Sequence, residues 1–131
     1  MTDIPTSIAN LLHSWADRTA HGQSDAILRD HAPSAVFFDV LPPLRHDATA
    51  AYRETWDGWQ PQTAGGFTFR LEDLDVTEGP DHAFAHGLLR CGGTTPDGRS
   101  FADLVRATFC LFRTSDGWRI VHQHISVPKD A

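Results

Sequence analysis

The order of patterns along this chain predicts an α+β fold, with three N-terminal helices packed on a curved, mixed or antiparallel β-sheet. Apolar residues repeat at intervals of three and four positions in the first half and alternate with polar residues in the second half. Prolines and glycines separate these segments, and no internal repeat or linker divides them. The 131 residues suffice for one core, so we expect a single domain over residues 1–131.

The first expected helix covers roughly residues 5–21, because its apolar residues fall on one side and Gly22 can adopt the left-handed conformation that ends a helix. That apolar side consists of Ile8, Leu11, Leu12, Trp15 and Ala16. Ser24 can cap a short second helix that continues to about His31, where Pro33 prevents a further turn.

A short strand, 35–39, and a third helix complete the first half. Asp47 can cap this helix, which ends before Pro61. The residues that maintain its spacing of three and four positions are Ala48, Ala51, Tyr52, Thr55, Trp56 and Trp59.

The second half is expected to form strands over 67–76, 81–91, 101–113 and 118–128. In the first of these the apolar residues change parity near Glu72-Asp73, which predicts a β-bulge that curves the sheet. A Pro- and Gly-containing turn is expected at 95–98.

The last two strands form a hairpin whose two faces differ in character. A three-residue loop, 115–117, with Gly117 left-handed, would place Thr114 opposite Trp118. The face toward the helices then carries Val105, Ala107, Phe109, Leu111, Val121, Gln123 and Ile125. The other face carries Arg106, Thr108, Cys110, Phe112, Ile120, His122, His124 and Ser126. This second face is half apolar, so we expect it to form a homodimer interface that weakens when its histidines are protonated, near pH 6.5.

Charge and composition exclude several classes of function. The chain has 11 Lys+Arg and 17 Asp+Glu, a formal charge of -6, without a basic cluster, so nucleic acid is not an expected partner. No apolar run is long enough to span a membrane and no signal peptide is evident, so we expect no membrane partner and a cytoplasmic location. Cys91 and Cys110 are expected to be reduced, and no cofactor is expected.

His122 and His124 are the nearest approach to a metal motif. Their side chains would lie about 7 Å apart on one strand face. A stable zinc site needs at least three protein ligands, and no third is near in sequence. We therefore expect no metal site, and interpret both histidines as hydrogen-bonded across the sheet or dimer contact.

The C-terminal hairpin resembles a known family. Arg106-Ala107-Thr108, then Asp116-Gly117-Trp118 and the strand Arg119-Ile-Val-His-Gln-His-Ile-Ser-Val-Pro128, resembles the closing hairpin of the SnoaL-like branch of the nuclear-transport-factor-2-like superfamily. The resemblance implies the cone-shaped α+β fold that this branch shares with ketosteroid isomerases and polyketide cyclases. It implies a fold more strongly than a reaction.

Asp39 is the candidate catalytic residue. In the ketosteroid isomerases, which the segment 32–39 resembles, the corresponding strand end carries the general base. A carboxylate at the mouth of an apolar cavity has a raised pKa and is a competent base near neutral pH. Alternatively, Asp39 bonds backbone amides in the turn before the two prolines. The family's oxyanion donors correspond here to Trp15 and, in place of an aspartic acid, Phe109, so ordinary ketosteroid isomerase activity is not expected.

The expected pocket takes a small apolar or oxygenated molecule. Its candidate ligand-binding residues are Trp15, Phe37, Trp59, Phe109 and Gln123. Each aromatic could instead be plain core. The leading hypothesis is a small-molecule-binding domain, an isomerase, cyclase or lyase that uses Asp39. The alternative is a non-catalytic ligand-sensing or assembly module, because the last strand also resembles that of calmodulin-dependent kinase association domains.

Overall fold

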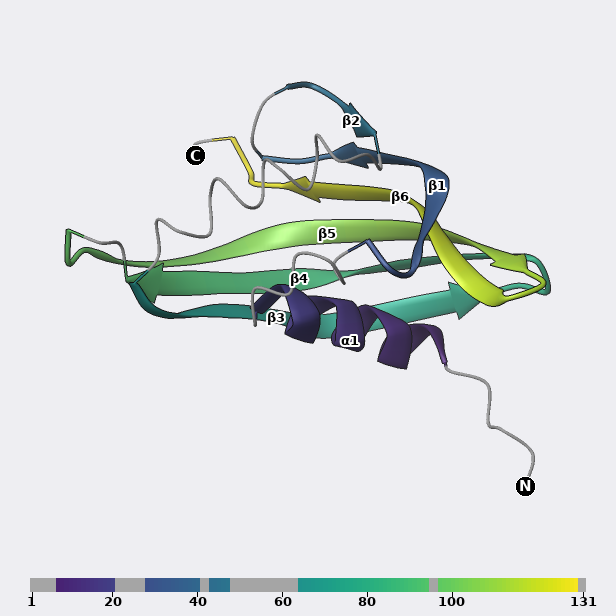
Figure 1. Ribbon diagram of the computed structural model, residues 1–131, viewed down its shortest axis with the longest axis horizontal. Helices are drawn as coiled ribbons and strands as arrows, with labels where there is room; N and C mark the ends of the chain where they lie inside the picture. The colour runs from purple at the N-terminus through teal and green to yellow at the C-terminus, as the bar shows by residue number, and fades with distance from the viewer. Residues whose placement is uncertain (1–6, 21–27, 41–42, 48–63, 95–96, 130–131) are drawn as a thin grey trace.

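A computed structural model of the protein describes residues 7–20, 28–40, 43–47, 64–94 and 97–129. In these segments, one helix, α1 (Ile8–Ala20), lies against one face of a mixed, curved sheet of six strands (Figure 1). The strands are β1 (His31–Phe38), β2 (His46–Asp47), β3 (Ala64–Glu78), β4 (His82–Thr94), β5 (Ser100–Thr114) and β6 (Gly117–Ser126). Within this described part of the chain, no helix has the length and apolar character that crossing a bilayer requires.

The spatial order of the strands is β2-β1-β6-β5-β4-β3. Strands β3 to β6 follow one another as antiparallel neighbours, because short turns join them. Strand β1 instead pairs in parallel with β6, from Val36 opposite His122 to Phe38 opposite His124. The N-terminal strand therefore lies beside the C-terminal strand, and Figure 1 shows the two running in the same direction.

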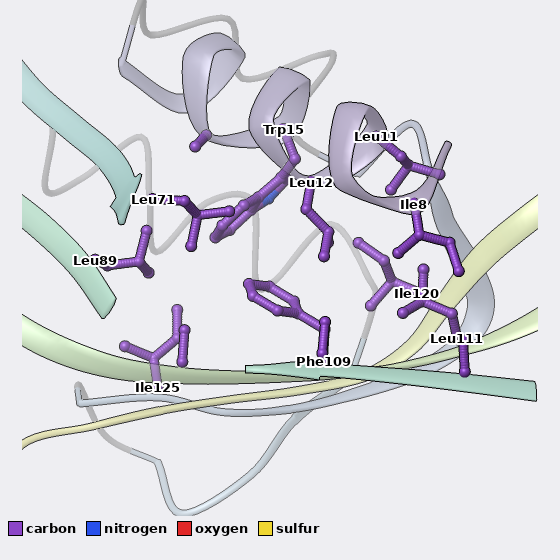
Figure 2. Close-up of a cluster of buried hydrophobic side chains, with 14 of the residues drawn as sticks. Ile8, Leu11, Leu12, Trp15, Leu71, Leu89, Phe109, Leu111, Ile120 and Ile125 are labelled. Atoms are coloured by element: carbon purple, nitrogen blue, oxygen red, sulfur yellow. The ribbon is translucent and has the colours of Figure 1, made fainter. Parts of the chain in front are cut away.

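The core lies between α1 and the sheet. Ser7 caps the helix, since its hydroxyl accepts a hydrogen bond of 3.1 Å from the amide of Asn10. The apolar side expected from the sequence is buried, as Figure 2 shows for Trp15 above Phe109. The fully buried apolar side chains on the helix and on β4 to β6 include Ile8, Leu12, Trp15, Leu89, Phe109, Leu111 and Ile120.

The three-helix expectation is corrected in part. The first helix is confirmed as α1. The second was expected to reach His31, but residues 28–30 form a turn and His31 begins β1. The carbonyl of Asp30 accepts a hydrogen bond of 2.8 Å from the amide of Ile120, so pairing with β6 overrides the local helix signal. The third helix lies outside the described residues, except that its expected cap, Asp47, belongs to β2.

Strand β1 begins at His31 rather than at the expected residue 35, so it includes Pro33. Its register against β6 shifts between His31 and Val36. Proline has no amide hydrogen to donate to a ladder, and such a residue is tolerated where the pairing is irregular. Pro33 is exposed, and the inward side of the strand carries His31, Ala35 and Phe37.

The bulge predicted near Glu72-Asp73 is confirmed. Glu72 pairs with Leu88 and Asp75 with His86, so two residues of β3 lie opposite Gly87 alone. Asp73 has a φ of 53°, a left-handed conformation that aspartate tolerates.

The C-terminal hairpin differs from its expected register near the turn. Gly117 has the expected positive φ, 110°, but Thr114 pairs with Gly117 rather than with Trp118. The register then shifts beyond Leu111, which pairs with Ile120, so that Phe109 lies opposite Gln123 as expected. Assignment of Ile120 to the outer face was wrong, because this residue is fully buried with the core. Val121, expected inside, is the extra residue of this bulge and is only half-buried.

Candidate functional site

Four of the five expected ligand-binding residues are buried: Trp15 and Phe109 belong to the core between α1 and the sheet, and Phe37 belongs to a second buried cluster with Ala35. Trp15, Phe37, Phe109 and Gln123 are each at most 1% exposed. Trp59 lies outside the described residues. The Trp15 ring makes edge-to-face contacts with Phe69 and Phe109, at centroid distances of 5.3 and 5.4 Å. A bound molecule is not needed to explain these aromatic contacts, so the ligand-binding role of these residues stays a prediction.

Gln123 has a partner that the sequence analysis did not identify. Its side-chain oxygen lies 2.7 Å from Nε2 of His31. The two residues meet because β1 and β6 are neighbours in the sheet, and Phe37 pairs with Gln123 in the register. The His31 ring also contacts the Phe37 ring edge-to-face, at a centroid distance of 5.0 Å. A polar pair is thus enclosed by apolar surface.

Burial holds His31 in its neutral form. Loss of water around the ring lowers the pKa of His31 from 6.5 to about 4, and the hydrogen bond to Gln123 and the charge of Asp30 compensate only in part. A neutral imidazole has one donor and one acceptor nitrogen. If Nε2 donates to the Gln123 oxygen, Nδ1 is the acceptor and presents a lone pair to the interior.

Among the residues that the structure describes, two buried side-chain polar atoms lack hydrogen-bond partners. They are Nε1 of Trp15 and Nδ1 of His31. A buried polar group without a partner costs roughly 1–3 kcal/mol, so such groups are uncommon unless a water or a ligand satisfies them. The Trp15 ring contacts Phe109, and Phe109 pairs with Gln123 across β5 and β6. Gln123 in turn contacts His31, so two side chains connect Trp15 with His31. This cluster, Trp15, His31, Phe37, Phe109 and Gln123, is called the inner cluster below.

Asp39 follows the end of β1, on the side of the strand that carries Phe37 by alternation. It is half-buried, and its carboxylate accepts a hydrogen bond of 2.6 Å from the amide of Val40. The turn-bonding alternative for Asp39 is therefore present. Asp39 also lines a shallow groove with Phe38, Pro43 and His124.

The negative charges of Asp39 and Asp103 both affect the thiol of Cys91, which lies at the end of the sheet away from the β5–β6 turn. Burial first, and then the charges of Asp103 and Asp39, raise the pKa of the Cys91 thiol to about 12. This thiol stays protonated near neutral pH and is a poor nucleophile. Cys91 lies on the inner side of β4 with Leu89 and packs against the core.

His122 and His124 lie on the outer face, opposite to Gln123, as the hairpin analysis predicted. Nδ1 of His122 lies 2.7 Å from the carbonyl oxygen of Val36. Both rings contact Phe38 edge-to-face, at 4.8 and 5.4 Å. Within the described part of the chain, no group of three or more His, Cys, Asp or Glu side chains is arranged to hold a metal ion.

The main residue that the sequence analysis missed is His31. It was assigned to the end of a helix, where it had no grouping with other polar residues. Starting the strand at residue 31 instead would place His31, Ala35 and Phe37 on one side by alternation. That signal was hidden by Pro33, which argues against a strand.

The chain matches the family model described as "SnoaL-like domain" over residues 8–130. Among solved structures, it is similar to a nuclear-transport-factor-2-like protein of unknown function from Pseudomonas putida, with 30% identity and a TM-score of 0.82, over 94% of this chain and 85% of that chain. A protein from Shewanella frigidimarina, provisionally assigned as a ketosteroid isomerase, has 17% identity and a TM-score of 0.73, over 92% and 95%. No curated protein matches the chain.

Association domains have the same fold. That of calmodulin-dependent protein kinase II from C. elegans has 13% identity and a TM-score of 0.71, over 92% of both chains. At such identities the likeness concerns the fold alone.

Proposed function

Because the chain belongs to the family of SnoaL-like domains, we propose that it binds a small apolar, oxygenated molecule at the inner cluster. The observation that carries this proposal is the pair of buried, unpartnered atoms, Nε1 of Trp15 and Nδ1 of His31. An oxygen of the ligand would accept a hydrogen bond from Trp15, and a hydroxyl would donate to His31. The surrounding aromatic rings would contact its apolar part.

We further propose that Asp39 acts as a general base on this ligand. The carboxylate would remove a proton from a carbon next to a carbonyl, and Trp15 would donate a hydrogen bond to the enolate oxygen that forms. Support comes from the position of Asp39, which follows the end of β1 on the side of the strand that carries Phe37. Isomerases, cyclases and lyases all use such a step, so the proposal names the step and not the product.

Binding can be tested with p-cresol and toluene, which differ by one hydroxyl group. We expect p-cresol to bind more tightly, and this preference to fall about tenfold in Trp15→Phe, which keeps an aromatic ring but has no donor. The matched control is His13→Gln, a change at an exposed position of the same helix. Calorimetric titration measures both affinities. Equal affinities of the parent protein for the two probes would contradict the proposal.

The catalytic step can be tested by hydrogen–deuterium exchange of phenylacetone in D2O. The parent protein should accelerate exchange next to the carbonyl, and Asp39→Asn should lower the rate about 10²- to 10⁴-fold. The control is Asp103→Asn, which removes the other carboxylate that acts on Cys91. Binding of p-cresol without any acceleration of exchange would reject Asp39 as a base and favour a non-catalytic module.

The alternative function, assembly, is favoured by the outer face of the sheet. Phe38, Phe84 and Phe112 are 39%, 51% and 46% exposed there. Three exposed aromatic rings on one face are unusual for a monomer. We propose that this face forms a homodimer contact about a two-fold axis. The kinase association domain among the structural neighbours supports an assembly role.

A further inference from the structure

Arginines gather in a groove at the end of the molecule where the β5–β6 turn approaches α1 and the start of β1. The groove has a volume of about 720 Å³. Its floor includes Leu11 and Trp118, and Ser14, Thr114 and Ser115 add hydroxyl groups. Four arginines line it, namely Arg18, Arg29, Arg113 and Arg119.

This groove is positive although the protein is negative. Its four arginines face two aspartates, Asp30 and Asp116, which leaves a formal charge of +2 in a chain whose charge is -6. Outside the groove, four of the described arginines have carboxylate partners within 3.4 Å, in the pairs Arg45–Asp47, Arg70–Glu72, Arg90–Glu72 and Arg99–Asp97. Excess positive charge is therefore concentrated here.

The walls of the groove are fixed by local contacts. Arg18 and Asp30 form an ion pair of 2.6 Å, with side chains only 12% and 20% exposed. In the turn, the Thr114 hydroxyl donates to the carbonyl of Gly117 at 2.8 Å and accepts from the amide of Asp116 at 3.2 Å. A groove with fixed walls loses little conformational entropy when it binds a ligand.

Arg29 and Arg119 are the arginines with unused capacity. Nη1 of Arg119 donates to the carbonyl of Trp118 at 2.8 Å, and a guanidinium has five N–H donors. Among the described residues, no carboxylate lies within ion-pair distance of either side chain. Arg113 is engaged differently, because its guanidinium lies 4.9 Å from the centre of the Trp118 ring and its Nη2 lies 4.0 Å from Oε2 of Glu78.

We propose that this groove binds a small organic anion through a phosphate or carboxylate group held by Arg29 and Arg119. The planar guanidinium donates two parallel hydrogen bonds to either group. The apolar part of the ligand contacts Leu11 and Trp118. This site is separate from the inner cluster and does not depend on the proposed function.

The test is a titration of the ¹⁵N-labelled protein at low ionic strength with phenyl phosphate, benzoate, inorganic phosphate and the neutral benzyl alcohol. Phenyl phosphate or benzoate should shift the amide signals of residues 113–119 in a saturable way, with a Kd below about 1 mM. The stronger of the two identifies the preferred anion. Saturation by inorganic phosphate with the same Kd as phenyl phosphate would reject the contact with Leu11 and Trp118.

Matched variants locate the site. Arg29→Gln and Arg119→Gln should each raise the Kd about tenfold. Arg106→Gln, which removes the same charge from the outer face of the sheet, should leave it unchanged. Trp15→Phe should also leave it unchanged, so failure of this proposal is distinguishable from failure of the inner cluster. Saturable shifts that persist in both arginine variants, or no shifts of residues 113–119 with any anion, would overturn the proposal.

Discussion

At the scale of single residues, the structure explains why chemistry-bearing side chains were only partly recognisable from the sequence. Gln123 was recognisable because it interrupts an apolar face, and it is buried there with a polar partner. That partner, His31, is 92 residues distant in the chain, so no local pattern joins them. Asp39 was recognised by its place at a strand end, and its catalytic role stays a prediction.

His31 should make the stability of the protein depend on pH. Its pKa is about 4 in the folded protein and 6.5 when the ring is exposed to water. Between these values the unfolded chain binds more protons, so the free energy of unfolding is fully retained above about pH 6.5 and falls toward pH 4. The expected loss attributable to this group is up to about 3 kcal/mol.

Urea unfolding at several pH values measures this dependence. In His31→Gln the decrease between pH 6.5 and 4 should be smaller by about the same amount. His13→Gln, at an exposed helix position, should retain the decrease of the parent protein. Identical slopes for the parent and His31→Gln would show that another group causes any pH dependence.

At the scale of elements, features with a local sequence signal were predicted correctly, whereas features that depend on pairing between distant residues were not. Helix α1 has its own apolar side and its own cap, and the β3 bulge is visible as a change of parity. The turn at 28–30 and the start of β1 depend instead on the hydrogen bond from Ile120 to Asp30. The shift at Val121 likewise has no signal in the sequence, and it moved Ile120 from the outer face to the core.

Gly87 should be required by the β3 bulge. A Cβ atom at this position would lie 3.0 Å from the carbonyl oxygen of Glu72 and 3.3 Å from Cα of Leu74. Both are backbone atoms, which cannot move without disturbing the bulge. Gly87→Ala should therefore lower the free energy of unfolding by about 1–3 kcal/mol, measured with urea. Thr108→Ala, at the exposed position paired with His86 beside it, should change this free energy by less than about 0.5 kcal/mol.

At the scale of the whole molecule, the outer face predicts self-association. If two copies pair through Phe84 and Phe112, the parent protein should sediment as a dimer at micromolar concentration. Phe84→Ser/Phe112→Ser should sediment as a monomer with unchanged secondary structure, because both side chains are exposed in one chain. Leu44→Ser, at an apolar residue 97% exposed outside the sheet, is the control and should remain dimeric. A monomeric parent protein would remove the interface.

The parallel pairing of β1 with β6 also has a consequence for how the chain folds. Joining His31 to Ile120 closes a loop of 89 residues, whereas β3 to β6 need only short turns. Loop closure costs more entropy as the loop lengthens, so the β3–β6 meander should form first and β1 should join it last. Amide hydrogens of β1 should then exchange with solvent faster than those of β4 and β5 in the native protein. The two residues of the inner cluster that β1 supplies, His31 and Phe37, would open without global unfolding and give a ligand its route into the interior.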